Sequence, residues 1–217
     1  MRIRFCRMLP RFYPILDPEI AARHGVDPVA AAEQILEGGA RILQFRYKGF
    51  FSREVFAQVE RVAELCRDAG VMFVVNDRAD LAAITGAALH LGQDDLTPSA
   101  ARKVVGAETL IGFSTHNERQ LRAAAAEPAN YLALGPIFGT SSKVNPDPIV
   151  GLDELRRLLP LTDRPLVAIG GITRSNVQAV LAAGADSVAI IGDLFAGGNV
   201  RACTEEWVSL TRVTQNV

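Results

Sequence analysis

The chain contains a short segment, QFRYK at residues 44–48, in which polar and aromatic side chains alternate. In a β-strand, residues two apart share one face, so an amide and two cations would lie together while Phe45 and Tyr47 face the other way. Arginine and lysine bind phosphate and carboxylate groups. The pattern therefore predicts an anion facing Gln44, Arg46 and Lys48. The alternative is a structural ion cluster, in which the two cations only neutralise nearby carboxylates.

Acidic residues follow two later aliphatic runs. Asp77 ends VMFVVND, and Asp94 and Asp95 follow ALHLG in the sequence GQDD. If adjacent strands bring them together, these carboxylates are the hard oxygen ligands that suit Mg²⁺, which takes one or two carboxylates and completes its shell with water and substrate phosphate. Ordinary alternatives remain open, because Asp77 could cap a helix or pair with Arg78, and the GQDD loop could simply precede the helix that Thr97 caps.

Two kinds of loop add groups that bind anions. The segment GPIFGTSSK at 135–143 supplies a third cation, Lys143, and several hydroxyls. Three cations and a carboxylate pair describe a diphosphate held through a metal. The segments IGGITRSN and IIGDLF favour a second site, in which backbone N–H groups and a helix N-terminus bind a phosphate. The alternative is that Gly170 and Gly171 only form a tight turn.

Eight aliphatic runs must position these groups. They are RFYPILD, RILQFRYK, VMFVVND, ALHLG, TLIGFS, YLALGP, PLVAIGG and SVAIIGD. Segments with helical periodicity lie between them, at 29–39, 53–70, 118–126, 153–159 and 175–185, and we expect the last helix at 199–213. Asp27-Pro28 and Thr97-Pro98 have the form of helix starts.

The near-continuous apolar character of these runs indicates a parallel sheet that is covered on both faces. Eight strand and helix units predict an α/β fold, a single compact (β/α)8 TIM barrel. In such a barrel the residues that follow the strands meet at one rim, where catalytic groups belong. The alternative is a doubly wound open sheet.

Composition sets limits on function. The chain has 217 residues, is 49% hydrophobic and 22% charged, and carries a net charge of −1, so it can bury a core but has no overall basic field for nucleic acid. No run approaches the roughly 18 apolar residues of a membrane span, and the three cysteines lack the spacing of a zinc or redox site. We expect a cytoplasmic protein with a basic extension at 1–10 and a catalytic barrel at 11–217. The sequence is compatible with a homo-oligomer.

Six segments, QFRYK, VNDRADLA, HLGQDD, GFSTH, GPIFGTSSK and AIGGI, occur in an order and at spacings that resemble the thiamine-phosphate synthase family over roughly residues 11–195. The resemblance implies an enzyme that couples 4-amino-2-methyl-5-hydroxymethylpyrimidine diphosphate with a thiazole phosphate. The products would be thiamine phosphate and pyrophosphate, and the cofactor would be Mg²⁺.

The resemblance also implies a role for each matching position. Asp77 and Asp95 would bind Mg²⁺, whereas Asp94 occupies a variable position of the motif. The pyrimidine diphosphate would be held by Gln44, Arg46, Lys48, Asn76, Ser114 and Lys143, of which Arg46, Lys48, Ser114 and Lys143 form the catalytic group. The thiazole phosphate would be held by Thr140, Ser142, Gly171, Ile191 and Gly192.

Two positions differ from the family pattern, because Ser142 replaces a threonine and Gly192 replaces a serine. Thiazole tautomerases are the nearest alternative, since they resemble the chain in the barrel and in a histidine corresponding to His116. They lack the glutamine and aspartate that Gln93 and Asp95 supply here. A non-catalytic phosphate-binding barrel is a third hypothesis, which the carboxylate pair argues against. We expect His90, within a strand, to belong to the core.

Overall fold

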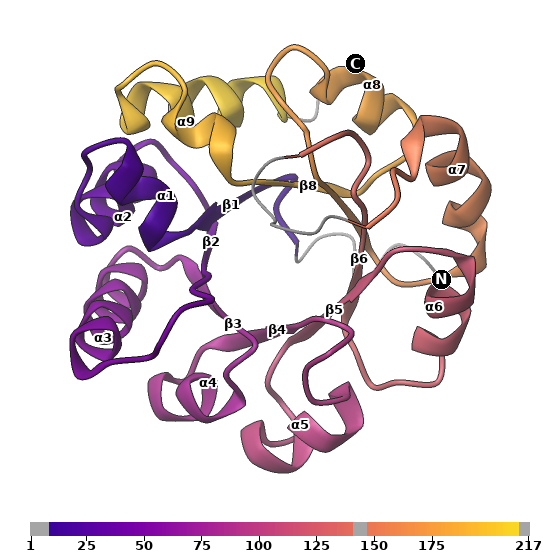
Figure 1. The fold of residues 1–217 in the computed structure, drawn as a ribbon, viewed down its shortest axis with the longest axis horizontal. Helices are drawn as coiled ribbons and strands as arrows, with labels where there is room; N and C mark the ends of the chain where they lie inside the picture. Colours follow the sequence, from indigo (N-terminus) through magenta and orange to yellow (C-terminus); the bar gives the residue numbers. More distant parts are fainter. Residues whose placement is uncertain (1–8, 141–146, 213–217) are drawn as a thin grey trace.

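Eight parallel strands close into a barrel in the computed structural model, which describes residues 9–140 and 147–212 (Figure 1). Each strand pairs with its neighbours in sequence, and β1 pairs with β8 to close the ring. The single (β/α)8 barrel is confirmed, and the open-sheet alternative is wrong. The strands are β1 Phe12–Leu16, β2 Ile42–Phe45, β3 Met72–Asn76, β4 Ala88–Leu91, β5 Ile111–Thr115, β6 Tyr131–Leu134, β7 Leu166–Ile169 and β8 Ser187–Ile190.

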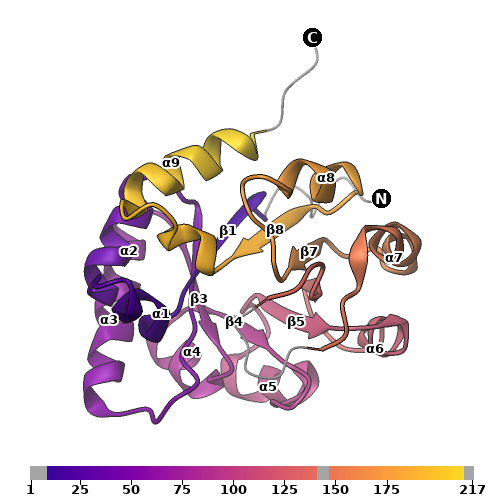
Figure 2. The same cartoon turned by 45° about the horizontal axis from the view of Figure 1, so that its top comes forward.

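The helices form a layer around the barrel (Figure 2). They are α1 Pro18–Arg23, α2 Pro28–Glu37, α3 Arg53–Asp68, α4 Ala79–Thr85, α5 Pro98–Val105, α6 Glu118–Ala124, α7 Gly151–Leu158, α8 Val177–Ala182 and α9 Val200–Leu210, with short 3₁₀ turns η1 Leu159–Leu161 and η2 Gly192–Phe195. No helix of residues 9–140 and 147–212 is both long enough and apolar enough to cross a membrane.

Predicted caps begin the helices as expected. The Asp27 carboxylate accepts hydrogen bonds from the N–H groups of Val29 and Ala30 at 2.9 and 3.0 Å, and Thr97 caps α5. Helix α1 is missing from the sequence prediction, although Asp17 and Pro18 at its start repeat the same signal. The α1 sequence PEIAAR contains a single large apolar residue, Ile20, so its helical periodicity is weak.

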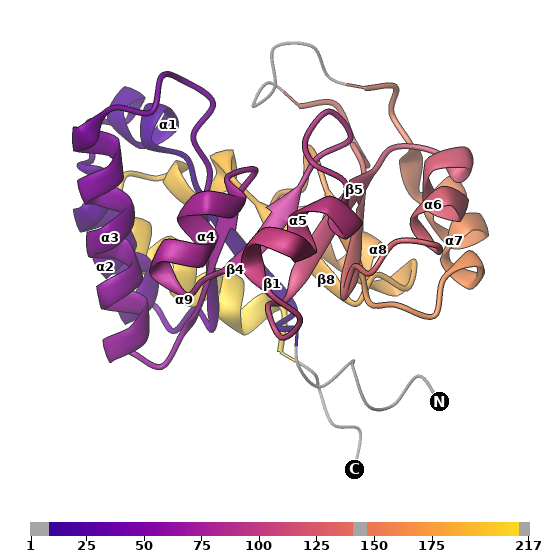
Figure 3. The same ribbon diagram turned by 90° about the horizontal axis from the view of Figure 1, so that it is seen from below.

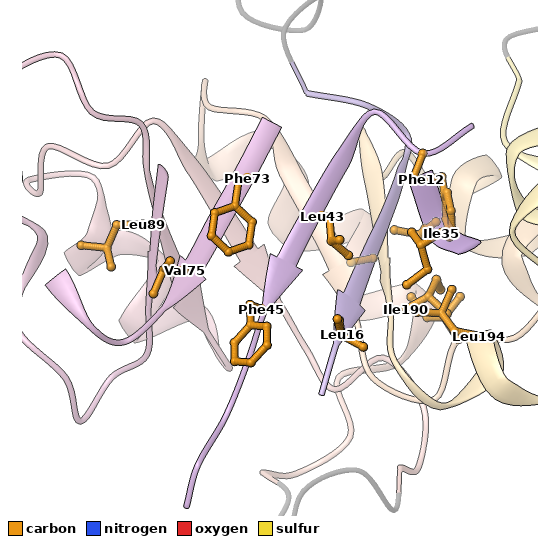
Figure 4. Packing of buried hydrophobic residues seen from close by; sticks show 14 of the residues in the cluster. Phe12, Leu16, Ile35, Leu43, Phe45, Phe73, Val75, Leu89, Ile190 and Leu194 are labelled. Carbon is orange, nitrogen blue, oxygen red and sulfur yellow. The ribbon is translucent and has the colours of Figure 1, made fainter. Parts of the chain in front are cut away.

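Alternation along the strands separates two cores. Phe45, Leu43 and Phe73 point toward the helices and pack in the outer core (Figure 4). Tyr13, Ile15, Ile42, Val74, Ala88, Tyr131, Ala133, Val167 and Ala189 form the inner core. Burying a large aliphatic side chain contributes about 1.5–3 kcal/mol, so both cores stabilise the ring. The inner core contains two tyrosines, and polar side chains lie beside it.

The rim at which the strands end is identified by α1, which directly follows β1 and lies at the top of Figure 3. Because the strands are parallel, all eight end at this rim. The last residues of these strands and the loops that follow them carry the residues singled out in the sequence.

Candidate active site

A cavity opens at the carboxyl-terminal rim of the barrel. Of the residues predicted from the sequence, those that line it are Gln44, Arg46, Lys48, Asn76, Asp77, Asp95, Ser114, Thr140 and Ile191. Gly171 and Gly192 lie in the same group of loops but do not line the cavity. Ser142 and Lys143 lie outside the described residues.

The QFRYK segment presents its polar side chains as predicted. Strand β2 ends at Phe45, earlier than the alternation suggested, yet Gln44, Arg46 and Lys48 all line the cavity. Phe45 is buried in the outer core, and Tyr47 packs against that core from the loop. The alternation in the sequence therefore correctly predicts which side chains point into the cavity, even beyond the end of the regular strand.

Both cations of this segment are paired with carboxylates. Arg46 Nη1 lies 2.5 Å from Asp17 Oδ2, and Lys48 Nζ lies 2.5 Å from Asp77 Oδ2. The ion cluster considered as an alternative is therefore present in the structure. A guanidinium has five N–H donors, so the contact with Asp17 leaves Arg46 able to bind a further anion.

Asp17 was not among the residues predicted for the site. Its side chain is buried, caps α1 and accepts from Arg46. The available signal was its position, because Asp17 follows β1 in the same way that Asp77 follows β3.

Asp77 has an unusual backbone and an unusual neighbour. Its φ of 64° makes it the only non-glycine residue at positive φ in the described part of the chain. This conformation costs about 1–2 kcal/mol for most side chains, and aspartate and asparagine tolerate it best. The ordinary interpretations of Asp77 are wrong, because α4 has no side-chain cap and Arg78 pairs with Asp80 at 2.5 Å.

The carboxyl groups of Asp77 and Asp95 lie close enough to shift each other's pKa. Burial and the hydrogen bond with Asp95 raise the pKa of Asp77 to about 6, although Lys48 acts in the opposite direction. Burial raises the pKa of Asp95, but hydrogen bonds from Asp77 and from the Gly92 N–H, 2.7 Å away, lower it overall. The pair thus disfavours two negative charges in the absence of a further cation.

This pair fits a magnesium ion in its donor chemistry. No group of three or more His, Cys, Asp or Glu side chains suited to a metal occurs within residues 9–140 and 147–212. Mg²⁺ needs fewer protein ligands, since it binds through one or two carboxylates and retains water or substrate phosphate. A cation bound by Asp77 and Asp95 would offset both the burial of the Asp77 carboxylate, the main cause of its raised pKa, and the smaller repulsion from Asp95.

Asn76 supplies an unsatisfied donor beside the carboxylates. Its side chain is buried and lines the cavity, and its Nδ2 has no hydrogen-bond partner among the described residues. A buried donor without a partner costs about 1–3 kcal/mol. Such a cost at a cavity wall indicates a ligand that accepts this hydrogen bond.

Polar side chains are linked across the floor of the cavity. The Gln44 amide donates to Tyr13 Oη, which contacts Tyr131 Oη. His90 bonds Tyr131 through Nδ1 and Ser114 through Nε2. His90 is buried, as expected for a core residue, and burial lowers its pKa to about 4, so the ring is neutral. The two tyrosines were not predicted for the site, although their strands face them inward.

Close packing explains the two glycines that follow β7. Gly170 and Gly171 have φ values of 95° and 63°. A Cβ on Gly170 would lie 2.5 Å from Pro136 Cβ, and one on Gly171 would collide with the carbonyl oxygen of Gly139. The close approach of the loop after β6 therefore requires both glycines, whether or not a phosphate binds there.

The loop after β8 is held by an ion network. Gly192 begins η2, is exposed and is not among the glycines at positive φ. The Asp193 carboxylate accepts from Arg174 Nε and from Trp207 Nε1, both at 2.9 Å. Arg174 also pairs with Glu206 at 2.5 Å. These contacts join the loops after β7 and β8 to α9.

The family model described as thiamine monophosphate synthase matches residues 12–194. The chain belongs to this family. The match covers almost the same range as the motifs in the sequence, and it confirms the family resemblance inferred from them.

Relatives within the family are similar along nearly their whole length. The chain is 48% identical over 200 residues to the thiamine-phosphate synthase of Koribacter versatilis, covering 89% of this chain and 93% of the relative. It is 38% identical over 200 residues to that of Laribacter hongkongensis, covering 91% and 93%. A solved thiamine phosphate pyrophosphorylase from Pyrococcus furiosus superposes with a TM-score of 0.82 at 30% identity, covering 93% of this chain and 95% of that one.

Proposed function

We propose that the rim of this barrel binds a pyrimidinylmethyl diphosphate at Asp77 and Asp95 through Mg²⁺ and transfers the pyrimidine to a thiazole phosphate. The reaction itself follows from the family, since the chain is a thiamine-phosphate synthase, a transferase that forms thiamine phosphate and releases pyrophosphate. The observation that carries the magnesium proposal is the placement of the Asp77 and Asp95 carboxyl groups in one cavity that is also lined by Arg46 and Lys48.

The residues around the carboxylates suit a leaving diphosphate. Lys48 and Arg46 line the cavity and would donate to diphosphate oxygens, and Asn76 Nδ2 offers a buried donor that has no partner among the described residues. When bound, Mg²⁺ would neutralise part of the charge on the diphosphate. The C–O bond to the diphosphate breaks with its electron pair going to pyrophosphate, and the thiazole nitrogen then forms the new C–N bond to the electron-poor methylene carbon.

The cavity has little need of a general base in this scheme. His90 is neutral and its ring nitrogens are bonded to Tyr131 and Ser114. His116 donates through Nδ1 to the Gly135 carbonyl at 2.6 Å, and its Nε2 lies 3.5 Å from Asp147 Oδ2, so both ring nitrogens face acceptors. Catalysis then depends on charge stabilisation and on placing the two substrates.

We place the thiazole phosphate at the loops after β6, β7 and β8. Thr140, Ile191 and Gly170 line the cavity on that side, and Gly192 begins η2 next to it. By family resemblance Ser142 belongs to the same proposal, whereas Lys143 belongs to the proposed pyrimidine diphosphate site. A cytoplasmic location is also part of it, because Cys66 and Cys203 are unpaired, as is usual in a reducing compartment.

The proposal is tested by incubating the purified protein with both substrates and measuring pyrophosphate and thiamine phosphate. We expect turnover with Mg²⁺ and none with excess chelator. Asp95→Asn should reduce the rate severely, whereas Asp94→Asn, a matched change at an exposed residue of the same loop, should reduce it far less. Coupling that persists with chelator would contradict the metal role. Isomerisation of the thiazole phosphate alone, without coupling, would favour the tautomerase alternative.

A further inference from the structure

A continuous series of hydrogen bonds crosses the barrel interior from β2 to β5. Gln44 Nε2 donates to Tyr13 Oη at 2.8 Å, and Tyr13 Oη lies 2.7 Å from Tyr131 Oη. His90 Nδ1 lies 3.0 Å from Tyr131 Oη, and its Nε2 lies 2.9 Å from Ser114 Oγ. We refer to these five residues as the interior chain. Both of its ends, Gln44 and Ser114, line the cavity.

The direction of every hydrogen bond in the interior chain follows from counting protons. The Gln44 nitrogen can only donate, so Tyr13 Oη accepts from it, and among the described residues Tyr131 Oη is the acceptor left for the single proton of Tyr13. Tyr131 then gives its proton to His90 Nδ1. A neutral imidazole that accepts at Nδ1 carries its proton on Nε2 and donates to Ser114 Oγ. The Ser114 proton is therefore left to donate to another group.

We propose that Tyr13, Tyr131 and His90 are positioning residues that fix which hydrogen-bonding groups the cavity offers to the pyrimidine. Gln44 offers its amide oxygen as an acceptor, and Ser114 offers its hydroxyl as a donor. This inference rests on the proposed binding of the pyrimidine diphosphate by Gln44 and Ser114. An amino group on the substrate ring matches the acceptor, and a ring nitrogen or diphosphate oxygen matches the donor.

The interior chain would give specificity that a single amide lacks. An isolated glutamine can rotate its amide by half a turn and offer either an oxygen or an N–H. In the interior chain, that rotation would face Tyr13 with an acceptor and would require every proton through to Ser114 to reverse. A pyrimidine with an oxo group in place of the amino group would need this reversal, so the cavity should select the amino-substituted ring.

The tautomer of His90 tests the direction of the interior chain. In full-length protein with ¹⁵N-labelled imidazoles, NMR at pH 7 is expected to show His90 with its proton on Nε2, the signal being assigned by its loss in His90→Gln. A proton on Nδ1 would overturn the proposal. In the Gln44→Glu variant, an ionised carboxylate can only accept from Tyr13, so the His90 proton should move to Nδ1. A tautomer unchanged in a variant shown to be ionised would also overturn it.

Kinetics test the role independently if Gln44→Glu fails to fold. Tyr131→Phe removes one hydroxyl from the interior chain and is expected to raise KM for the pyrimidine diphosphate roughly tenfold. KM for the thiazole phosphate should not change, and the preference for an amino over an oxo pyrimidine should narrow. Tyr47→Phe is the matched control, because Tyr47 packs toward the outer core, and it should change none of these values.

The possible outcomes separate the two proposals. An equal rise in KM for both substrates in Tyr131→Phe would show that the hydroxyl has only a structural role and would overturn the inference. Wild-type protein that binds no pyrimidine diphosphate would contradict the proposed function of Gln44 and Ser114, and with it the inference. If His90 nevertheless carried its proton on Nε2, the hydrogen bonds of the interior chain would run in the proposed direction, and the identity of the ligand would be the part of the proposal that is wrong.

Discussion

Asp77→Asn is expected to stabilise the metal-free protein above pH 6 while removing most of its activity. Asparagine resembles a protonated aspartate in shape, and it tolerates the φ of 64° at this position. The variant should therefore behave as if Asp77 were permanently neutral. Activity should fall severely, because a charged ligand for a hard cation is lost.

The sign of the effect follows from the raised pKa. Asp77 changes from its ordinary value of 3.8 to about 6 on folding, so the folded state holds the proton more tightly than the unfolded state. Wild-type stability from this group is therefore lost as pH rises from about 4 to about 6, and it stays lost above that range. The shift corresponds to about 3 kcal/mol at most. Since Asp95 changes in the opposite direction, we expect a net gain of about 1–2 kcal/mol for the variant.

Urea unfolding with chelator present, at pH 4.5 and pH 7.5, measures this difference. Asp77→Asn and wild type should have similar free energies of unfolding at the lower pH, and the variant should be the more stable at the higher pH. Asp94→Asn, at an exposed residue, serves as the control and should show no such pH dependence. A variant that is less stable than wild type at pH 7.5 would refute the reasoning. It would show that Asp77 stabilises the fold as the partner of Lys48.

Three further predictions concern other parts of the site. Gly192→Ser should lower KM for the thiazole phosphate by up to about tenfold, and its melting temperature should not change because the Gly192 backbone is not at positive φ. A change in KM for the pyrimidine diphosphate alone would show that the two anion sites are exchanged. Asp193→Ala should reduce the free energy of unfolding, measured in urea, by about 2–4 kcal/mol, because Arg174 and Trp207 lose their acceptor. Glu206→Ala, at the exposed end of the same network, is the control, and an equal loss of stability in both variants would contradict the prediction. ¹⁵N NMR should show a neutral His90 ring at pH 5, since burial lowers its pKa from 6.5 to about 4, and a charged ring at pH 5 would refute this. The stability that the neutral ring contributes should be lost as pH falls from 6.5 to about 4.

The sequence predicted the barrel well because each strand carries its own local signal. The aliphatic runs, the Asp27 and Thr97 caps and the polar residues that follow the strands needed no knowledge of distant contacts. The period of two also predicted which side of QFRYK faces the cavity. Helix α1 was missed because Ile20 is its single large apolar residue, which gives no recognisable periodicity.

Contacts across the barrel could not be predicted in the same way. Tyr13 and Tyr131 are 118 positions apart, and alternation shows only that each faces inward, not which residue each meets. The pairing of Arg46 with Asp17 has the same origin, since it depends on how β1 and β2 are placed. The double glycine shows the opposite problem. Its sequence favours a phosphate loop, whereas close packing against the loop after β6 already accounts for it.

The pairing of β1 with β8 has a consequence for how the chain folds during synthesis. Phe12 lies opposite Val188, and the Ser187 hydroxyl donates to the Pro10 carbonyl at 2.7 Å, so the ring closes between the first and the last strand of the barrel, which are synthesised far apart in time. Until residues 187–190 emerge, β1 has one unpaired edge that can associate with another nascent chain. Such a long separation in sequence also makes closure slow relative to forming neighbouring strand pairs. A chain stopped before β8 should therefore aggregate rather than persist as a stable open sheet.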